Sequence, residues 1–464
     1  MRSELETAIA KRAKTAHAAS DAIWDYAELG LTEDKSAKLL ADILEQEGFS
    51  VTRGVAGMPT AFVAEAVIGT GSPVIGFLAE YDALPMVSQK AGVTRQDPLR
   101  AGGPGHACGH NAMGSMQALT VCAVKEVLEK NGLSATLRYF GTPAEELLAG
   151  KAFMAREGFF KGLDAVIDCH ANAFFKVSHG VENNALFSFV ATFHGITAHA
   201  GSRPWEGRSA ADAVELMHAG TERLREHMLP EQRIHWVTLG GATAPNVVPD
   251  LARTWYYVRS QDDVIRLLYE RIADCAKGAA LMTGTAHELR MLAACHQRYS
   301  NKALAEAIFA NVAAVGVPEY TEAEQAFARE LQKNVGAPEV GMAVEMELID
   351  ASKAPFRGDS SDVGDVTLCA PTATLNFPSW VPGAKAHAWS VTACQKSSIT
   401  HKGIDAAALV EGLTVLDLVT RPELVAAIRE EFAALSASRP YVNFLDPGTV
   451  PPLDWHAADM EPFR

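Results

Sequence analysis

Strands and helices alternate along the first third of the chain, and this alternation restricts the fold more than any other feature. Helical periodicity alternates with short apolar runs that are bounded by Gly, Pro and Asn, which is typical of strands. The predicted helices cover residues 4–29, 34–48, 111–130 and 147–159, and the predicted strands cover 60–68, 74–79, 136–140 and 165–167. Strands separated by helices of this length favour a largely parallel sheet with helices on both faces.

The pattern changes near residue 184 and changes back near residue 297. Between these points the sequence predicts strands at 187–193, 234–241, 253–259 and 287–293, and helices at 209–227 and 262–283. Their order, β-α-β-β-α-β, is that of a ferredoxin-like unit. We therefore predict an α/β protein whose larger domain, residues 1–184 and 297–464, is interrupted by a smaller α+β domain at 185–296.

Length and composition exclude several classes of protein. A chain of 464 residues that is 48% hydrophobic can build two domains with their own cores. The formal net charge is −15 and no basic stripe is present, which argues against nucleic acid as a partner. No apolar run reaches the roughly 18 residues of a membrane span, and the start lacks a secretory pattern. Together with seven scattered cysteines, this predicts a cytoplasmic protein that binds neither nucleic acid nor membrane.

Three short segments carry side chains that bind metals. Residues 106–111 read His-Ala-Cys-Gly-His-Asn at a loop-to-helix junction, and thiolate and imidazole are ligands that transition metals prefer. Residues 143–146 read Pro-Ala-Glu-Glu and residues 168–170 read Asp-Cys-His, each next to a predicted strand. Because sites in open parallel sheets form at the carboxyl ends of strands, we predict that these segments meet in one metal site.

The adjacent carboxylates Glu145 and Glu146 suggest two different tasks. Neighbouring residues of a regular strand or helix cannot point the same way, but on a turn one carboxylate can bind metal while the other stays free. A free carboxylate can take a proton from a water that a metal has activated. Alone, the pair would be interpreted as a solvated helix start. Beside the other candidate ligands, the catalytic interpretation is favoured.

Taken as an ordered set, these motifs resemble those of the M20 family of metal-dependent aminoacylases and carboxypeptidases. The set consists of His106-Ala-Cys-Gly-His-Asn111, Pro143-Ala-Glu-Glu146, Asp168-Cys-His170, His199-Ala-Gly201, Pro245-Asn-Val-Val-Pro249 and Gly358-Asp-Ser-Ser-Asp-Val-Gly-Asp365. The resemblance covers nearly the whole chain and is strongest to the branch with a cysteine ligand, which hydrolyses indole-acetyl-amino acids or p-aminobenzoyl-glutamate. It implies a dinuclear-metal catalytic domain that is interrupted by a lid domain, and the lid usually also forms the dimer.

The resemblance also implies a role for individual residues of the catalytic domain. Glu145 would be the general base. A last histidine ligand is expected near the C-terminus, where His387 after the Pro-Gly turn is preferred over His401. The full ligand set would be Cys108, His110, Glu146, His170 and His387.

Three residues of the predicted lid match family positions that contact the substrate. His199 corresponds to a histidine that reaches the partner's active site and stabilises the oxyanion. Asn246 corresponds to an asparagine near the scissile carbonyl or the substrate's carboxylate. Arg259 corresponds to an arginine that binds the free α-carboxylate, to which a guanidinium can donate two parallel hydrogen bonds. Without the resemblance, Arg259 would be interpreted as a surface charge.

Two positions depart from the family pattern. Many members of this branch carry Asp where this chain has Asn111, and we expect Asn111 to cap the helix. Glu80 stands where family members carry His or Asp. Asp82, two residues later, is predicted to orient His110.

The implied reaction is hydrolysis of the amide bond of an N-acyl or N-aroyl amino acid, most similar to p-aminobenzoyl-glutamate, with two divalent ions. A thiolate ligand favours Zn²⁺, whereas the resemblance favours Mn²⁺, which we prefer. One alternative is an aminoacylase, a dipeptidase or an indole-acetyl-amino-acid-type amidohydrolase. Another is a non-catalytic subunit of the same fold, against which the intact Glu145 argues. A homodimer through the lid is expected, and a heteromer with a related subunit is the alternative.

Overall fold

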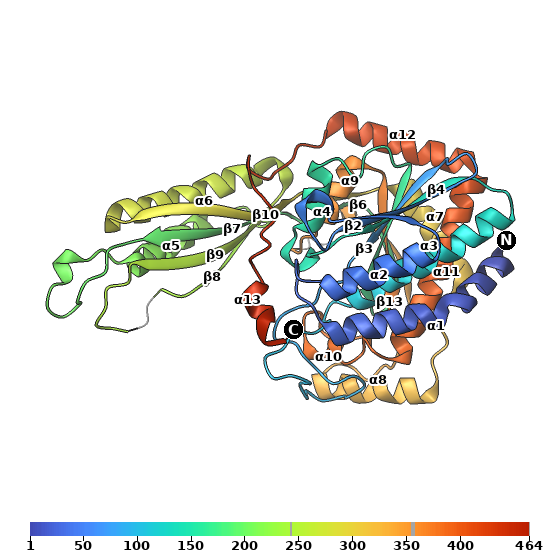
Figure 1. Ribbon diagram of the computed structural model, residues 1–464, viewed down its shortest axis with the longest axis horizontal. Coiled ribbons are helices and arrows are strands. Elements are labelled where there is room, and N and C mark those ends of the chain that lie inside the picture. Colours follow the sequence, from blue (N-terminus) through green and yellow to red (C-terminus); the bar gives the residue numbers. More distant parts are fainter. Residues whose placement is uncertain (242–243, 354–357, 464) are drawn as a thin grey trace.

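The computed structural model describes residues 1–241, 244–353 and 358–463, which form two separate sheets with their own helices (Figure 1). The larger sheet has the order β1-β2-β4-β3-β5-β13-β6-β11, with β12 beside β6. Strands β4, β3, β5 and β13 run parallel to one another, and antiparallel pairs lie toward the margins. The strands are β1 (Ser50–Arg53), β2 (Phe62–Ile68), β3 (Val74–Ala79), β4 (Ala135–Gly141), β5 (Ala165–Asn172), β6 (Phe175–Glu182), β11 (Arg298–Ser300), β12 (Met346–Asp350) and β13 (Thr372–Pro378). The predicted mostly parallel sheet is confirmed.

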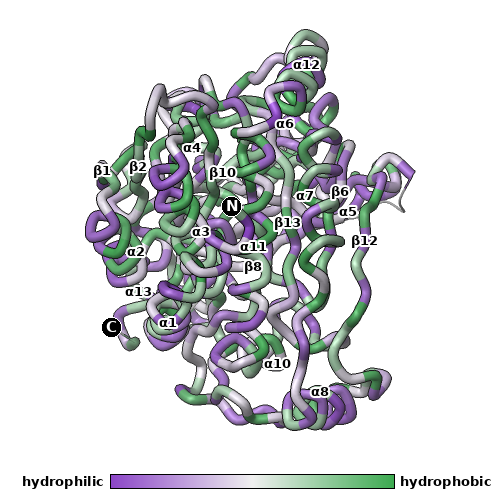
Figure 2. The backbone as a smooth tube through the Cα atoms, turned by 90° about the vertical axis from the view of Figure 1, so that its right-hand side faces the viewer, coloured by the Kyte–Doolittle hydropathy of each residue, from purple (hydrophilic) through white to green (hydrophobic). Residues whose placement is uncertain are grey.

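Helices cover both faces of this sheet. One face packs against α2, α3, α7 and α11, with α1 lying on α3 and α11, and the other face packs against α4 and α9. The helices of the body are α1 (Arg2–Tyr26), α2 (Asp34–Gln46), α3 (His110–Lys130), α4 (Gly150–Arg156), α7 (Lys302–Val315), α8 (Glu322–Val335), α9 (Val363–Cys369), α10 (Trp389–Thr392), α11 (Ser398–Thr420), α12 (Pro422–Ser438) and α13 (Ala457–Met460). The peripheral α8 is largely hydrophilic (Figure 2). Within the described residues, no helix combines the length and apolar character needed to cross a membrane.

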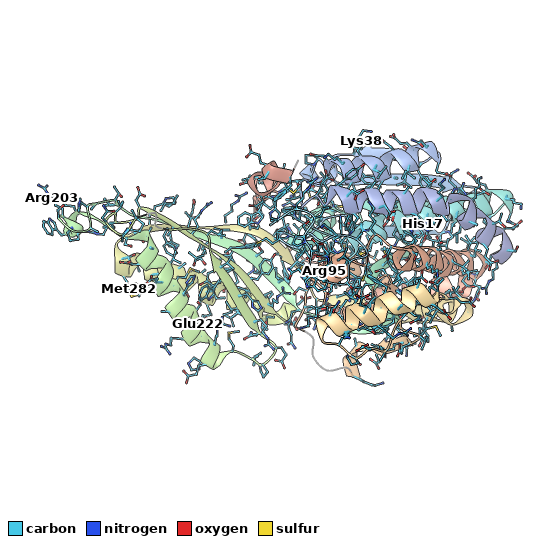
Figure 3. The ribbon with its side chains drawn as sticks, turned by 90° about the horizontal axis from the view of Figure 1, so that it is seen from below. His17, Lys38, Arg95, Arg203, Glu222 and Met282 are labelled. Carbon is cyan, nitrogen blue, oxygen red and sulfur yellow. The ribbon has the colours of Figure 1, made fainter. Side chains whose placement is uncertain are left out.

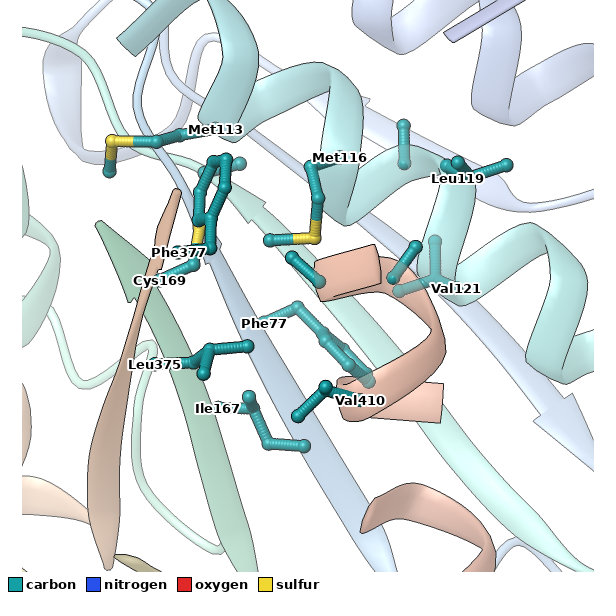
Figure 4. Close-up of a cluster of buried hydrophobic side chains, with 14 of the residues drawn as sticks. Phe77, Met113, Met116, Leu119, Val121, Ile167, Cys169, Leu375, Phe377 and Val410 are labelled. Atoms are coloured by element: carbon teal, nitrogen blue, oxygen red, sulfur yellow. The ribbon is translucent and has the colours of Figure 1, made fainter. Parts of the chain in front are cut away.

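The central core lies between α3, the sheet and α11 (Figure 4). Met116 of α3 points toward the cluster that contains Phe77 of β3 and Val410 of α11, and all three are fully buried. Helix α3 is buried along most of its length, which explains why it is apolar beyond a single stripe. This packing fixes the amino end of α3, where residues 106–111 lie.

The smaller sheet projects from the body (Figure 1). Its elements are β7 (Ala185–His194), α5 (Ala210–Leu224), β8 (Arg233–Thr238), β9 (Leu251–Ser260), α6 (Asp262–Thr283) and β10 (Ala286–Cys295), in the predicted β-α-β-β-α-β order. The sheet is fully antiparallel, with the order β10-β7-β9-β8, and α5 and α6 pack on it. We call this unit the lid. Alternate residues of β9 are buried, as the period of two predicts for a sheet with one covered face.

The segment 440–463 crosses from the lid to the body. On the lid side, the Trp455 ring lies 4.9 Å from the ring of Trp255. On the body side, the Arg156 guanidinium donates a hydrogen bond of 2.6 Å to the carbonyl of Thr449. The segment is mostly coil, as its composition suggests, and it links the two parts of the molecule beyond the chain connections at β7 and β10.

Sequence patterning did not reveal β1, β6, β11, β12 or β13. In β6, the polar side chains of Lys176 and Ser178 are buried, so the strand lacks a clear alternation of apolar and polar residues. β11 and β12 are short, at 3 and 5 residues. These strands are recognised by their pairing partners rather than by their own composition.

Candidate metal and catalytic site

The predicted motifs meet at one edge of the large sheet. Strands β3, β4 and β5 are parallel neighbours, so the residues that follow β3 and β4 and the end of β5 lie together. Along β5, Cys169 faces the apolar core while His170 faces the opposite side, as the period of two requires. The loop that holds His387 joins this edge because its backbone N–H donates a hydrogen bond of 2.9 Å to the carbonyl of Ala107.

The five side chains predicted as metal ligands lie close together. Cys108 Sγ is 3.5 Å from His170 Nε2, His110 Nε2 is 3.9 Å from Glu146 Oε1, and His387 Nε2 is 3.6 Å from Glu146 Oε2. Atoms that bind one ion at about 2.1 Å are separated by roughly 3 to 3.5 Å. Cys108 belongs both to a group with His110 and His170 and to a group with Glu146 and His387. The arrangement therefore offers two neighbouring positions for a metal.

Unpaired polar atoms at this edge fit a cation. His110 Nε2 and Glu146 Oε1 are buried and lack a hydrogen-bond partner among the described residues. A buried polar atom without a partner costs about 1–3 kcal/mol. Because the donors are a thiolate, imidazoles and a carboxylate, a divalent transition metal is the group that would satisfy them.

Asp82 contacts two of the candidate ligands at once. One of its oxygens lies 2.9 Å from His110 Nδ1, and the other accepts the backbone N–H of Glu146 at 3.0 Å. A proton on Nδ1 leaves the Nε2 lone pair of His110 directed into the site, which is how metal-binding histidines are usually oriented. The geometry agrees with the role expected for Asp82.

The turn that carries the paired carboxylates has an unusual backbone. Glu145–Leu147 forms a single 3-10 turn, η2, between Ala144 and Leu148, which both have a φ of +58°. Left-handed backbone at residues other than glycine costs about 1–3 kcal/mol and is found where function requires it. The turn sends the two side chains apart. Glu146 joins Cys108 and His387, whereas Glu145 joins His110 and Glu80.

Glu145 is buried and lines the cleft described below. Burial raises the pKa of its carboxyl well above the usual value, and the charge of the neighbouring Glu80 raises this pKa further. A carboxyl in this setting holds a proton readily once it has taken one. Glu145 is therefore suited to accept a proton and to return it later.

A cleft of about 850 Å³ opens beside the candidate ligands. Arg259 and Tyr257 reach it from β9 of the lid, with the guanidinium of Arg259 5.6 Å from the ring of Tyr257. Another part of its wall is lined by Asp168, from the predicted Asp-Cys-His segment, and by Arg298, which the sequence patterns did not indicate. The cleft is thus lined by the candidate base, by one predicted substrate-binding residue and by every candidate ligand except the fully buried His110.

The two other predicted substrate-binding residues and the alternative ligand His401 lie away from the candidate ligands. His199 is exposed, and its carbonyl accepts the backbone N–H of Arg203 at the far tip of the lid (Figure 3). Asn246 is also exposed and lies beside it, since its carbonyl accepts the N–H of Ala200. His401 faces α1, with Nε2 2.9 Å from Asp21 Oδ1. The structure therefore brings His387 and not His401 to the candidate ligands, and it places His199 and Asn246 away from the cleft of their own chain.

The prediction that Asn111 caps α3 is wrong. The residue at the N-cap is Gly109, and Asn111 lies inside the helix, where its side-chain amide donates to Ser20 Oγ and to the carbonyl of Gln395, both at 3.0 Å. An amide supplies donors that a carboxylate lacks. Asn111 therefore ties α3 to α1 and to the loop before α11.

A buried ion-pair network lies behind Glu145, and sequence reasoning missed it. The Lys151 Nζ is 2.7 Å from Glu80 Oε1 and 2.7 Å from Asp362 Oδ1, and all three side chains are buried. Asp362 belongs to the segment 358–365, which was noted only as part of the family resemblance. Glu80 directly follows β3, and this position at the end of a strand was the one feature of the sequence that could have indicated the network.

This fold and site are those of a metal-dependent hydrolase of amide bonds with a lid. The sequence model of Peptidase family M20/M25/M40 matches residues 76–355, and the chain belongs to this family.

The chain is similar to proteins of different substrate classes. It is 36% identical to one subunit of the p-aminobenzoyl-glutamate hydrolase of Escherichia coli (strain K12), over 91% of this chain and 92% of that protein. It is 28% identical to the human Xaa-Arg dipeptidase, over 96% of each chain. A dinuclear metal binding peptidase of the M20 family from Bacillus subtilis shares the fold, with a TM-score of 0.55 and 17% identity over 88% of this chain and 99% of that one.

Proposed function

We propose that this protein hydrolyses the amide bond of an N-aroyl or N-acyl amino acid, with p-aminobenzoyl-glutamate as the model substrate. The observation that carries the proposal is that four of the five candidate ligands line one cleft together with Glu145 and Arg259, while the buried His110 groups with Cys108 and His170 beside it. The 36% identity to the Escherichia coli p-aminobenzoyl-glutamate hydrolase chain supports the aroyl-glutamate class. Dipeptide hydrolysis is the second candidate, since the chain is also similar to a dipeptidase.

Two divalent ions would be held by Cys108, His110, Glu146, His170 and His387, of which Cys108 lies close to both groups of candidate ligands. When bound, such ions supply Lewis-acid activation of the amide carbonyl and of the attacking water. We favour Mn²⁺ over Zn²⁺, although the thiolate alone would favour Zn²⁺. The five ligands come from four segments of the body that are distant in the sequence, so the site requires the folded sheet edge.

Glu145 would move the proton of the reaction. Its carboxylate takes a proton from water as the water attacks the amide carbon, and the protonated carboxyl then gives this proton to the leaving amine nitrogen. The buried setting of Glu145 limits exchange of this proton with bulk solvent. Asp82 would keep the Nε2 of His110 directed into the site throughout.

A hydrolysis panel tests the proposal. Purified protein would be stripped with a chelator, reloaded with Mn²⁺ or Zn²⁺, and assayed on p-aminobenzoyl-glutamate, indole-acetyl-aspartate and an Xaa-Arg dipeptide, with metal content measured in parallel. We expect about two ions per chain and fastest release of glutamate from the aroyl substrate. Hydrolysis of the dipeptide alone would favour the second candidate. Failure to cleave any substrate with metal bound would indicate a non-catalytic subunit.

Arg259→Ala should reduce kcat/KM by about 10- to 150-fold, because it removes a charge-assisted contact worth about 1.5–3 kcal/mol to the substrate's α-carboxylate. The variant should no longer distinguish the free acid from its methyl ester, which wild-type protein should hydrolyse poorly. Kinetics on both substrates measure this. Arg253→Ala is the matched control, since Arg253 lies on the same strand, is exposed and does not line the cleft. A variant that still prefers the free acid would contradict the assignment.

We propose that residues 185–296 form a lid and dimerisation domain, which lets His199 and Asn246 act in a second copy's cleft. Their position at the lid tip, away from their own cleft, supports this. The body would comprise residues 1–184 and 297–464. A heteromer is the alternative, because the Escherichia coli relative is named as one subunit of its enzyme.

Mixing Glu145→Gln chains with His199→Ala chains should restore activity to about a quarter of the wild-type value at equal amounts, since half of the dimers would be mixed and would hold one complete site. Each variant alone should be nearly inactive. Activity is measured after subunit exchange, which labelled chains can verify. Recovery that never exceeds the activities of the separate variants, despite verified exchange, would show that His199 does not act across a dimer.

A further inference from the structure

Glu80 is a buried carboxylate beside the candidate metal ligands, and the ligand set above gives it no task. It follows directly on β3 and is 2% exposed. Its Oε2 lies 3.3 Å from Nε2 of His110, and its Oε1 lies 2.7 Å from Nζ of Lys151. The two oxygens therefore have different neighbours.

The contact between Glu80 and His110 requires a positive group. With the Nδ1 proton of His110 shared with Asp82, a neutral His110 presents a lone pair on Nε2. Glu80 Oε2 and His110 Nε2 are both buried and have no hydrogen-bond partner in the described parts of the chain. A lone pair and a carboxylate oxygen repel each other at 3.3 Å unless a metal ion lies between them or a proton binds Nε2. The spacing is that of two ligands of one ion, about 3 to 3.5 Å.

Lys151 determines which oxygen of Glu80 is left for such an ion. Its ammonium group pairs with Glu80 Oε1, so Oε2 alone remains for the site. The position of Lys151 is fixed in turn by Asp362, whose carboxylate accepts hydrogen bonds from the Lys151 ammonium at 2.7 Å and from its backbone N–H at 2.8 Å. This network limits Glu80 to binding through one oxygen.

We propose that Glu80 is a further metal ligand, bound through Oε2 to the ion that His110 holds, and that Lys151 is the positioning residue for it. The proposal rests on the metal site of the proposed function. A further oxygen donor raises the coordination number and makes the donor set harder. It therefore shifts the preference of this position from tetrahedral Zn²⁺ toward Mn²⁺.

Glu80→Gln tests the proposal through metal binding rather than turnover. Mn²⁺ affinity of stripped protein would be measured by competition with a chelator, together with ions bound per chain. We expect wild-type protein to bind two ions and the variant to bind one of them at least about tenfold more weakly, as loss of supporting contacts alone typically costs 10–100-fold. Glu411→Gln is the matched control, because Glu411 is fully buried with an unpaired oxygen but contacts Gln117 on the core side. It should bind both ions as wild type does.

The outcomes separate the two proposals. No ion in the wild-type protein would contradict the proposed function itself. Two ions in wild type and unchanged affinity in Glu80→Gln would overturn only the role of Glu80, leaving it as a hydrogen-bond partner of a protonated His110. If the variant does not fold, anomalous diffraction from Mn²⁺-loaded wild-type crystals decides whether Glu80 binds the ion. An ion within about 2.5 Å of Oε2 supports the proposal, and a separation beyond about 3.5 Å overturns it.

Discussion

Glu145→Gln should retain both metals and lose about 10²- to 10⁴-fold in kcat, the usual contribution of a general base. Glutamine has nearly the same shape as glutamate, so the 3-10 turn η2 and the contacts of Glu146 are kept. What disappears is the oxygen that accepts the proton of water. Steady-state kinetics on the best substrate of the panel, with metal content measured on the same sample, check both parts of the expectation.

Glu146→Gln is the control, because the same chemical change one residue later should act differently. Glu146 lies within 3.9 Å of His110 and 3.6 Å of His387, so its loss should lower metal occupancy. Its activity should rise again when excess metal is added, whereas that of Glu145→Gln should not. If Glu145→Gln stays within a few-fold of wild type, Glu145 is not the base.

Lys151→Met should destabilise the body by about 3–5 kcal/mol, the usual effect of removing one partner from a buried ion pair. The substitution leaves the carboxylates of Glu80 and Asp362 buried without their cation. Urea denaturation of stripped protein measures the loss as a shift in the midpoint of the body's unfolding transition. Stripped protein is required because bound metal would add its own stabilisation.

Lys130→Met is the matched control for this loss. Lys130 lies 2.7 Å from Glu4 Oε1, the same distance as in the buried pair, but its side chain is 64% exposed. Exposed pairs contribute about 0–1 kcal/mol. Adding Asp362→Asn to Lys151→Met should recover part of the stability, since one unpaired charge is then removed. Equal losses of stability in Lys151→Met and Lys130→Met would contradict the claim that the buried ion pairs of Lys151 stabilise the body.

Features that depend on local sequence could be predicted. The lid can be predicted from the order of the periodic segments between residues 185 and 296. A period of two marks each strand and a period of 3.6 marks each helix, and both are visible within the element itself. The candidate ligands follow from position, since Glu146 comes just after β4 and His170 lies near the end of β5. Parallel strands bring such positions to one edge without any knowledge of side-chain packing.

Features that depend on distant contacts could not be predicted. Lys151 and Asp362 are 211 residues apart, and no periodicity indicates that a lysine at the start of a short helix is buried. The same applies to Asn111, whose side chain reaches Ser20 and Gln395 on two other segments. Strand β6 was missed because its buried polar residues suit their neighbours rather than an alternating pattern.

The position of β13 has a consequence for how the polypeptide is made. β13 pairs with β5 in the middle of the large sheet, yet it begins about 200 residues after β5 ends, with the lid encoded between them. At about 5–20 residues per second, the ribosome needs roughly 10–40 s to supply this neighbour. For that time the nascent chain carries an open, apolar sheet edge at β5, which is the kind of edge that aggregates or recruits chaperones. The lid, with its own local pairing, can fold during the wait.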